Sequence, residues 1–378
     1  MNVKARPNQL LLVAALAVSL ATITLVESWF VHRRELVFSS RMHQAAELCE
    51  RWFDVVAEVK REKGIAGDSH TATRFASMIG DEYTFTTTTL GSLESKETSA
   101  NPDFAALFVR WYIEAGLDSS STIGLTMSGS FPSLGIAALA AAQTLGADVV
   151  VFSSLGASTY GANQPNMTWL DMESELREHG GLRTRSEIVT LGGENDNGGG
   201  MFEDGAAMLH AAADRNGVTL YEPSALDKSI LRKTATLMDR KIDLLVNIGG
   251  NQASLGRCSH ASTIPTGLHE HWHGCADEER GIITRLAEFG IPFVHVLNIK
   301  DIAGRYGMPI SPGPTIAEST ALYSKEVVNP VGPIAGIVLV LGLLIGVKVW
   351  RSSPPRAVSA RTPTIADGAF HVCERKSE

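Results

Sequence analysis

Two uncharged apolar runs, residues 7–26 and 327–347, bracket a long and mostly polar middle region. Each run is close to the roughly 20 residues that a helix needs to cross a lipid bilayer. The pattern predicts a transmembrane helix at 7–27 and another at 327–347. Residues 1–6 would then form a cytoplasmic N-terminus, and residues 348–378 a disordered cytoplasmic tail rich in Ser, Pro and Arg.

Basic residues that follow the second run set the expected orientation. They precede the first acidic residue of the tail: Lys348, Arg351, Arg356, Arg361. The positive-inside rule places this tail in the cytoplasm, although Arg33, Arg34 and Arg41 after the first run oppose the assignment. We therefore expect a two-pass protein of the cytoplasmic (inner) membrane with an extracytoplasmic main domain.

Two other interpretations of the apolar runs stay open. Ser19-Leu20-Ala21 resembles a signal-peptide cleavage site, but the apolar residues continue to Val26 and favour an uncleaved anchor. Alanine-rich runs also form buried helices in large domains. The length and terminal position of these runs favour membrane spans.

Apolar residues recur at intervals of three or four in the segment after the first run: Ala45, Leu48, Trp52, Val56, Val59. This spacing predicts an amphipathic helix. The helix either extends outward as a stalk or packs against the main domain. We assign residues 28–80 to a helical stalk.

From residue 81 onward, short β-rich runs alternate with helical segments. Strands are expected at 83–90, 122–127, 148–153, 187–191, 243–248 and 292–297, and helices at 132–145 and 224–240 among others. Such alternation is typical of a parallel sheet covered on both faces. Residues 81–326 are predicted to form an α/β domain with a mainly parallel, doubly wound sheet flanked by helices.

Composition and charge narrow the expected partners. The apolar fraction of 44% and the 35 glycines suit a folded α/β domain. The formal net charge is −8, which disfavours a general polyanion-binding surface, so no nucleic acid is expected as a partner.

Small and polar residues follow most of the predicted strands, and all of these loops should lie along the carboxyl edge of the sheet, where ligands bind in open α/β folds. Glycine lets backbone N–H groups approach a ligand, which suits a carboxylate, phosphate or peptide. Such residues are also common in ordinary tight turns. The candidate ligand-binding residues are Ser128, Gly129, Ser130, Ser154, Asn195, Asp196, Gly249, Gly250 and Asn251.

Known catalytic and cofactor motifs are not found in these loops. Ser128-Gly129-Ser130 lacks the Gly-x-Ser-x-Gly form of a nucleophile elbow, and no spacing singles out His210 or His295 as a base. The dinucleotide fingerprint and the Walker loop are absent from the sequence. We expect no cofactor and assign no catalytic residue.

Histidines and cysteines concentrate in one segment: Cys258, His260, His269, His271, His273, Cys275. His269, His271 and His273 could contribute to a zinc site, but the spacing matches no standard zinc motif. We favour a disulfide between Cys258 and Cys275 and therefore expect no metal; the zinc site is one alternative to it, and ordinary loop residues are the other. The first two exclude each other, because a disulfide sulfur cannot serve as a thiolate ligand.

Several segments resemble the membrane-associated family of poly-γ-glutamate system proteins. They are residues 112–117 (YIEAGL), 124–132 (GLTMSGSFP), 153–158 (SSLGAS), 168–173 (TWLDME) and 247–251 (NIGGN), together with the terminal apolar runs. The similarity covers most of residues 1–350. It implies an accessory component that works with an ATP-dependent, Mur-ligase-like synthetase and a small membrane partner to make or export γ-linked polyglutamate.

Three functional hypotheses follow from the sequence and the resemblance. The leading one is a membrane-anchored accessory component of poly-γ-glutamate synthesis or export that binds γ-glutamyl polymer or the other membrane subunits of a synthase complex. Arg183, Arg185 and Arg257 are its candidate carboxylate-binding residues. The alternatives are an extracytoplasmic amidase or peptidase that acts on the polymer, and a structural scaffold.

Overall fold

The computed structural model describes residues 7–65, 71–275, 279–316 and 319–352, so the predicted N-terminus 1–6 and most of the predicted tail lie outside the described residues. The chain forms two compact units. One contains residues 34–325, and the other contains residues 1–33 and 326–378.

The larger unit is built on a six-stranded mixed sheet in the order β6-β4-β3-β7-β9-β8. Five strands are parallel, and β8 runs antiparallel to β9 at one edge. The prediction of an α/β domain with a mainly parallel sheet is therefore confirmed. The strands are β3 (Thr122–Ser128), β4 (Asp148–Ser154), β6 (Ser186–Thr190), β7 (Leu244–Ile248), β8 (Gly267–His269) and β9 (Phe293–Val296).

The strand order reverses between β3 and β7. The chain passes from β3 outward to β4 and β6 and then returns to β7 on the other side of β3. Helices follow the strands: α5 (Pro132–Leu145), α6 (Trp169–His179), α7 (Glu203–Arg215), α8 (Leu226–Asp239), α9 (Gln252–Leu255), α10 (Ile282–Glu288) and α11 (Ile299–Arg305). The loops after β3 and β7 therefore flank the point at which doubly wound sheets bind ligands.

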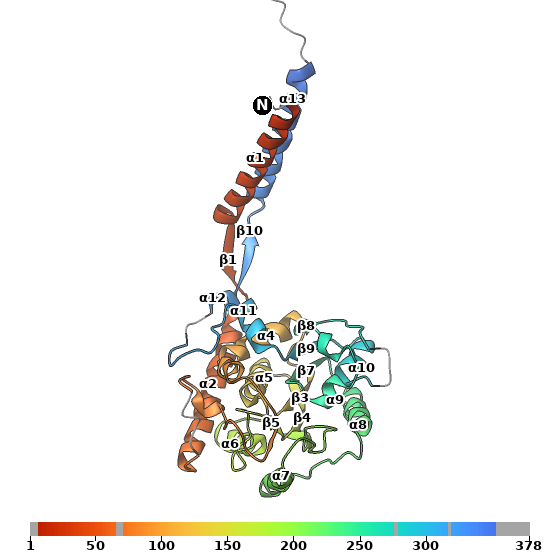
Figure 1. Ribbon diagram of the computed structural model, residues 1–378. Coiled ribbons are helices and arrows are strands. Elements are labelled where there is room, and N and C mark those ends of the chain that lie inside the picture. Colours follow the sequence, from red (N-terminus) through yellow and green to blue (C-terminus); the bar gives the residue numbers. More distant parts are fainter. Residues whose placement is uncertain (1–6, 66–70, 276–278, 317–318, 353–378) are drawn as a thin grey trace, which may run out of the picture. The chain divides into compact units, whose positions relative to one another are not determined.

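Apolar side chains cover both faces of the sheet, as alternation along the strands requires. On β4, Val151 belongs to the larger core cluster, whereas Val150 and Phe152 belong to the second cluster. In Figure 1, α2 and α5 lie on one side of the sheet and α8 and α10 on the other. Gly124 leaves room for α8, because a Cβ there would lie 2.8 Å from Leu237 Cδ2.

The amphipathic helix expected after the first apolar run is α2 (Ser39–Glu62), and it packs into the larger unit. Its residues Met42, Ala45, Trp52 and Val56 are fully buried. The Trp52 indole donates a hydrogen bond of 2.7 Å to the Gly180 carbonyl. Of the two arrangements left open by the sequence, the structure has the packed one.

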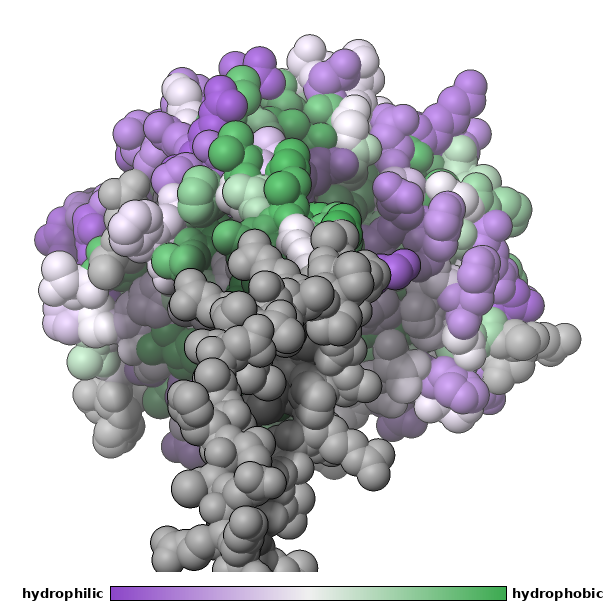
Figure 2. Space-filling view, turned by 90° about the horizontal axis from the view of Figure 1, so that it is seen from above, coloured by the Kyte–Doolittle hydropathy of each residue, from purple (hydrophilic) through white to green (hydrophobic). Residues whose placement is uncertain are grey.

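Shorter elements complete the larger unit. The Thr-rich strand expected at 83–90 is only β2 (Thr87–Thr89), which pairs with β5 (Ala157–Ser158) outside the main sheet. The remaining helices are α3 (Leu93–Ser99), α4 (Asp103–Glu114) and α12 (Thr320–Tyr323), with 3-10 turns at Ala76–Met78 and Ala261–Thr263. Figure 2 shows hydrophilic residues around the margin of one face and hydrophobic residues nearer its middle.

The smaller unit contains α1 (Pro7–Trp29) and α13 (Val331–Ser352) packed together. A Cβ at Gly336 would lie 2.1 Å from Thr22 Cγ2, so glycine permits the close approach of the two helices. Strand β1 (Val31–Glu35) pairs with β10 (Ser324–Val328). Within the described residues, none of the helices combines the length and the apolar character needed to cross a membrane.

The second core cluster provides a test of the fold. Phe152→Ala should lower the free energy of unfolding by about 3–5 kcal/mol, because it removes a ring that is 1% exposed and leaves a cavity. Phe289→Ala, at a ring that is 67% exposed, should change it by less than about 0.5 kcal/mol. Chemical denaturation of both variants measures the difference, and equal effects would contradict this core assignment.

Candidate functional site

The sheet face that packs against α8 changes from apolar to polar toward its carboxyl edge. In the middle of the strands this face carries Val150, Leu245 and Phe293 in one row. In the next row toward the edge, Phe152 and Ile188 are still apolar, whereas their row partners Thr126, Asn247 and His295 are polar. The row after that is polar at Ser128, Ser154 and Thr190. The loops expected to converge at this edge do so above these rows.

A buried ion pair holds the glycine-rich loop 192–200 against the sheet. Asp196 is 2% exposed and accepts a bond of 2.5 Å from Lys233 on α8. It also accepts hydrogen bonds from Thr190 at 2.7 Å, from Ser154 at 3.2 Å and from Ser229. Two candidate ligand-binding residues, Ser154 and Asp196, are thus brought together as partners of each other.

The neighbouring residue Asn195 faces a different group. Its backbone N–H donates to Gln252 Oε1 at 2.6 Å, and its side-chain oxygen accepts from Arg257. The backbone of Asn195 is left-handed, with φ of 59°, a conformation that asparagine tolerates better than most residues. The loop after β6 therefore meets the segment after β7, and Arg257 is the predicted carboxylate-binding arginine that lies at this edge.

A second buried network joins β3, β7 and β9. Thr126 donates to Asn247 Oδ1 at 3.0 Å, and Asn247 Nδ2 lies 3.0 Å from His295 Nδ1. Burial, with a smaller contribution from His269, lowers the pKa of His295 to about 4, so this histidine is neutral at pH 7. The contact of His295 Nδ1 is with the Asn247 side-chain amide. Among the described residues, no serine or threonine hydroxyl is hydrogen-bonded to His295, so we do not assign it as a base.

The candidate residues at the strand-order reversal lie close together. A Cβ at Gly249 would lie 3.0 Å from Ser128 Oγ, so the loops after β3 and β7 touch. The Gly129 N–H donates to the Ser154 carbonyl at 2.8 Å. Asn251 caps α9 by accepting from the Ser254 N–H at 2.8 Å, and Gly250 beside it is exposed.

Lys96 is a site residue that sequence reasoning missed. It lies on α3, is 2% exposed, and donates to the Ser130 carbonyl and to Ser158 Oγ, the latter at 2.7 Å. Its ammonium group lies 3.8 Å from the centre of the Phe131 ring. Burial alone lowers its pKa to about 7. The sequence around it, Leu93–Ser99, is polar and gives no signal that this lysine is buried.

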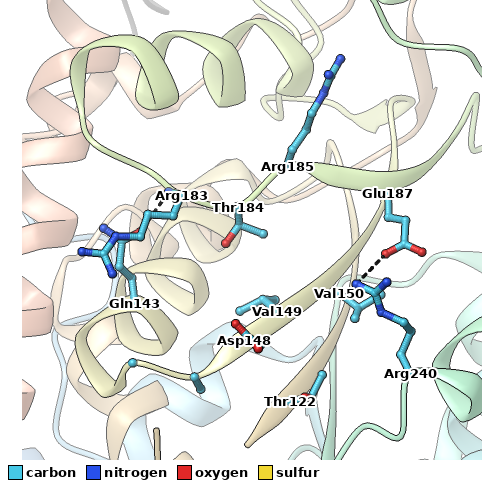
Figure 3. A pocket seen from close by; sticks show the side chains of 12 residues that line it. Thr122, Gln143, Asp148, Val149, Val150, Arg183, Thr184, Arg185, Glu187 and Arg240 are labelled. Atoms are coloured by element: carbon cyan, nitrogen blue, oxygen red, sulfur yellow. Dashed lines mark hydrogen bonds and ion pairs between the residues drawn. The ribbon is translucent and has the colours of Figure 1, made fainter. Parts of the chain in front are cut away.

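Two of the three predicted arginines lie at the opposite, amino edge of the sheet. Arg183, Arg185 and Arg240 line a pocket of about 580 Å³ beside the first residues of β3, β4 and β6. In Figure 3, Arg183 and the Arg240–Glu187 pair lie on opposite sides of this pocket, and Arg185 points away from both. Arg240 lies 3.3 Å from Glu187, and Arg185 donates to the carbonyls of Asn216 and Gly217.

The cysteine and histidine segment contains a disulfide. Cys258 and Cys275 are bonded, with Cα atoms 5.9 Å apart, so neither sulfur can ligate a metal. His269 contacts the Thr266 carbonyl, and His271 and His273 are exposed. Among the described residues, the side chains close enough to share a metal ion are Glu175, Glu178 and His179 on α6, outside the predicted set.

The Asp196–Lys233 pair provides a stability test. Asp196→Asn should lower the free energy of unfolding by about 3–5 kcal/mol, because it leaves the Lys233 charge buried without a counter-charge. Adding Lys233→Met to the same chain should recover part of the loss, since no charge then remains buried. Denaturant titration measures both, and a cost below about 1 kcal/mol for the single change would contradict the assignment.

The pKa of Lys96 predicts a pH-dependent stability difference. The pKa of a lysine in the unfolded chain is about 10.4, whereas that of Lys96 in the folded chain is about 7. Between pH 7 and pH 10 the unfolded chain therefore binds more protons at this residue than the folded chain. The wild-type protein therefore gains stability from Lys96 as the pH rises through this window, because the buried amine no longer has to carry a charge. The stability of Lys96→Met minus that of the wild type should fall from pH 7 to pH 10, as measured by denaturation at each pH. A difference that does not change with pH would contradict a lowered pKa.

Comparisons with known proteins add little to this geometry. The chain matches no known protein family and no characterised protein. LysN, an alpha-aminoadipate aminotransferase from Thermus thermophilus solved with N-(5'-phosphopyridoxyl)-L-leucine, aligns with 80% of this chain at 13% identity and a TM-score of 0.18. The chain spans 60% of that protein's length. A similarity of this size supports no statement about fold or function.

Proposed function

We propose that the protein is a membrane-anchored accessory component of poly-γ-glutamate synthesis or export and binds γ-glutamyl polymer. The observation that carries the proposal is the gathering of Arg183, Arg185 and Arg240 around one pocket in a protein of net charge −8. An acidic protein repels a polyanion overall, so binding requires a local positive group, and the Arg183 guanidinium is the one that faces the pocket without a partner among the described residues.

The pocket has the groups that a γ-glutamyl chain would need. Each residue of this polymer carries one carboxylate and one amide N–H. Arg183 is exposed, and its guanidinium has no hydrogen-bond partner among the described residues, so it can bind a carboxylate through two parallel N–H groups. Asp148 is an exposed acceptor for an amide N–H on the pocket wall.

Membrane anchoring is proposed from the terminal apolar runs. Large apolar side chains are exposed along both terminal helices, among them Leu16 at 61% and Leu20 at 56% on α1, and Ile337 at 60% and Val338 at 63% on α13. Apolar surface of this kind marks a membrane or protein contact. We place the larger unit outside the cytoplasmic membrane, beside the other membrane subunits of a poly-γ-glutamate synthase complex.

A second candidate function, cleavage of the γ-glutamyl polymer by an extracytoplasmic amidase or peptidase, is favoured by one observation. The buried amine of Lys96 lies 2.7 Å from a serine hydroxyl, that of Ser158. A lysine with a lowered pKa can act as the base that activates a nucleophile.

Binding of a short γ-glutamyl oligomer to the full-length protein in detergent tests the leading proposal. Arg183→Gln should weaken binding about tenfold, since one charge-assisted contact contributes about 1.5 kcal/mol. Arg232→Gln removes the same charge from α8, where the guanidinium lies over the Tyr221 ring, and should leave the affinity within about twofold. Isothermal titration calorimetry measures the affinities.

Two results would contradict the binding proposal. One is the absence of measurable binding to the wild-type protein. The other is an equal loss of affinity in the Arg183 and Arg232 variants, which would indicate that only the overall charge matters.

A further inference from the structure

Lys96 is a buried cation whose contacts are all neutral. It bonds to a serine hydroxyl and a backbone carbonyl and lies over an aromatic ring. The charged residues on the elements around it are engaged elsewhere: Glu94 with Lys300, Glu97 with Thr71 and Ser311, and Asp81 with Gln164. No carboxylate among the described residues therefore holds this lysine in its charged form.

A neutral lysine amine has the hydrogen-bonding groups that a general base needs. It has one lone pair and two N–H groups, so it can keep its bond to the Ser130 carbonyl while the lone pair accepts the proton of Ser158 Oγ. A base works best when its pKa lies near the working pH, and burial brings Lys96 to about 7. Both the distance to Ser158 Oγ and the lowered pKa therefore suit Lys96 to act as a base.

Ser158 lies on β5, beside the loop that follows β3. Its backbone N–H donates to Ser130 Oγ at 3.0 Å, which ties it to the turn that enters α5. Gly91 lies close to the hydroxyl and is half-buried itself; a Cβ at this position would lie 2.8 Å from Ser158 Oγ. A glycine at this position keeps a side chain of residue 91 away from the hydroxyl of Ser158, a residue that is 6% exposed.

We infer that Lys96 and Ser158 form a serine–lysine dyad that cleaves amide bonds of γ-glutamyl polymer. This inference rests on the second candidate function. Helix α5 begins at Pro132 without a side-chain cap, and the N–H groups of Ser133 and Leu134 in its first turn are candidate donors for the oxyanion.

The reaction proceeds in two balanced halves. Ser158 Oγ attacks the amide carbonyl carbon while Lys96 Nζ takes the hydroxyl proton, and Lys96 returns that proton to the amine that leaves as the C–N bond breaks. Water then attacks the ester on Ser158, with Lys96 again accepting a proton. The C–O bond to Ser158 breaks, Lys96 reprotonates Ser158 Oγ, and a carboxylic acid is released.

Covalent labelling tests the dyad without any polymer. The full-length protein in detergent is treated with a fluorophosphonate probe between pH 6 and pH 9, and the adduct is located by mass spectrometry. We expect the adduct on Ser158, with a labelling rate that rises with pH through about 7. Lys96→Met should slow labelling at least about a hundredfold.

Two control variants separate a base from a structural lysine. Lys96→Arg keeps a cationic donor that does not lose its proton, so a folded Arg variant should still label at least about a hundredfold more slowly. Lys60→Met removes another buried lysine, whose pKa burial lowers to about 8, and should label at the wild-type rate. Circular dichroism reports whether each variant is folded.

The outcomes decide the inference even if one variant fails to fold. A wild-type protein without an adduct on Ser158, or a folded Lys96→Arg variant that labels at the wild-type rate, would overturn the dyad. Shortening of γ-glutamyl polymer that Ser158→Ala abolishes would support the substrate class, and unchanged polymer would overturn that class alone. Failure of polymer binding at Arg183 would leave the labelling result unaffected.

Discussion

A sheet that is buried on both faces forces each polar side chain near its carboxyl edge to find a partner inside the protein. In this chain the face beneath α8 becomes polar toward that edge, first on β3, β7 and β9 at Thr126, Asn247 and His295. The surrounding loops supply the partners. The Asp196–Lys233 pair fixes the loop after β6, and Lys96 joins α3 to the turn after β3 and to β5. These contacts account for the ordered edge of the sheet.

The same constraint separates structural from chemically available groups. Asp196 has four side-chain donors around it, and its charge is balanced by Lys233. Lys96 has hydrogen bonds but no balancing charge, which leaves its amine with a near-neutral pKa. At the opposite edge, Arg183 is exposed and faces an open pocket. The carboxyl edge thus holds a buried amine without a counter-charge, and the amino edge holds an exposed guanidinium; we propose proton transfer at the first and anion binding at the second.

Much of the sheet could be predicted because its strands are continuous apolar runs that end in small polar residues. The runs at 122–127, 148–153 and 243–248 correspond closely to β3, β4 and β7. Strand β8 was missed because its three residues, of mixed polarity, are too few to show the alternation of apolar and polar positions that marks a strand. The positions of Arg183 and Arg185 were missed because residues that precede a strand lie at its amino edge, far from the carboxyl-edge loops. Burial of Lys96 depends on tertiary packing of a helix whose sequence is typical of an exposed one.

The most direct measurement is the pKa of the Lys96 amine, obtained by NMR titration of the isotope-labelled full-length protein, with Lys96→Met used to assign the signal. We expect a value near 7, because the amine is buried among neutral groups. A value of about 10.4, that of a solvated lysine, would show that the amine is exposed or balanced by a negative charge and would contradict its burial among neutral groups.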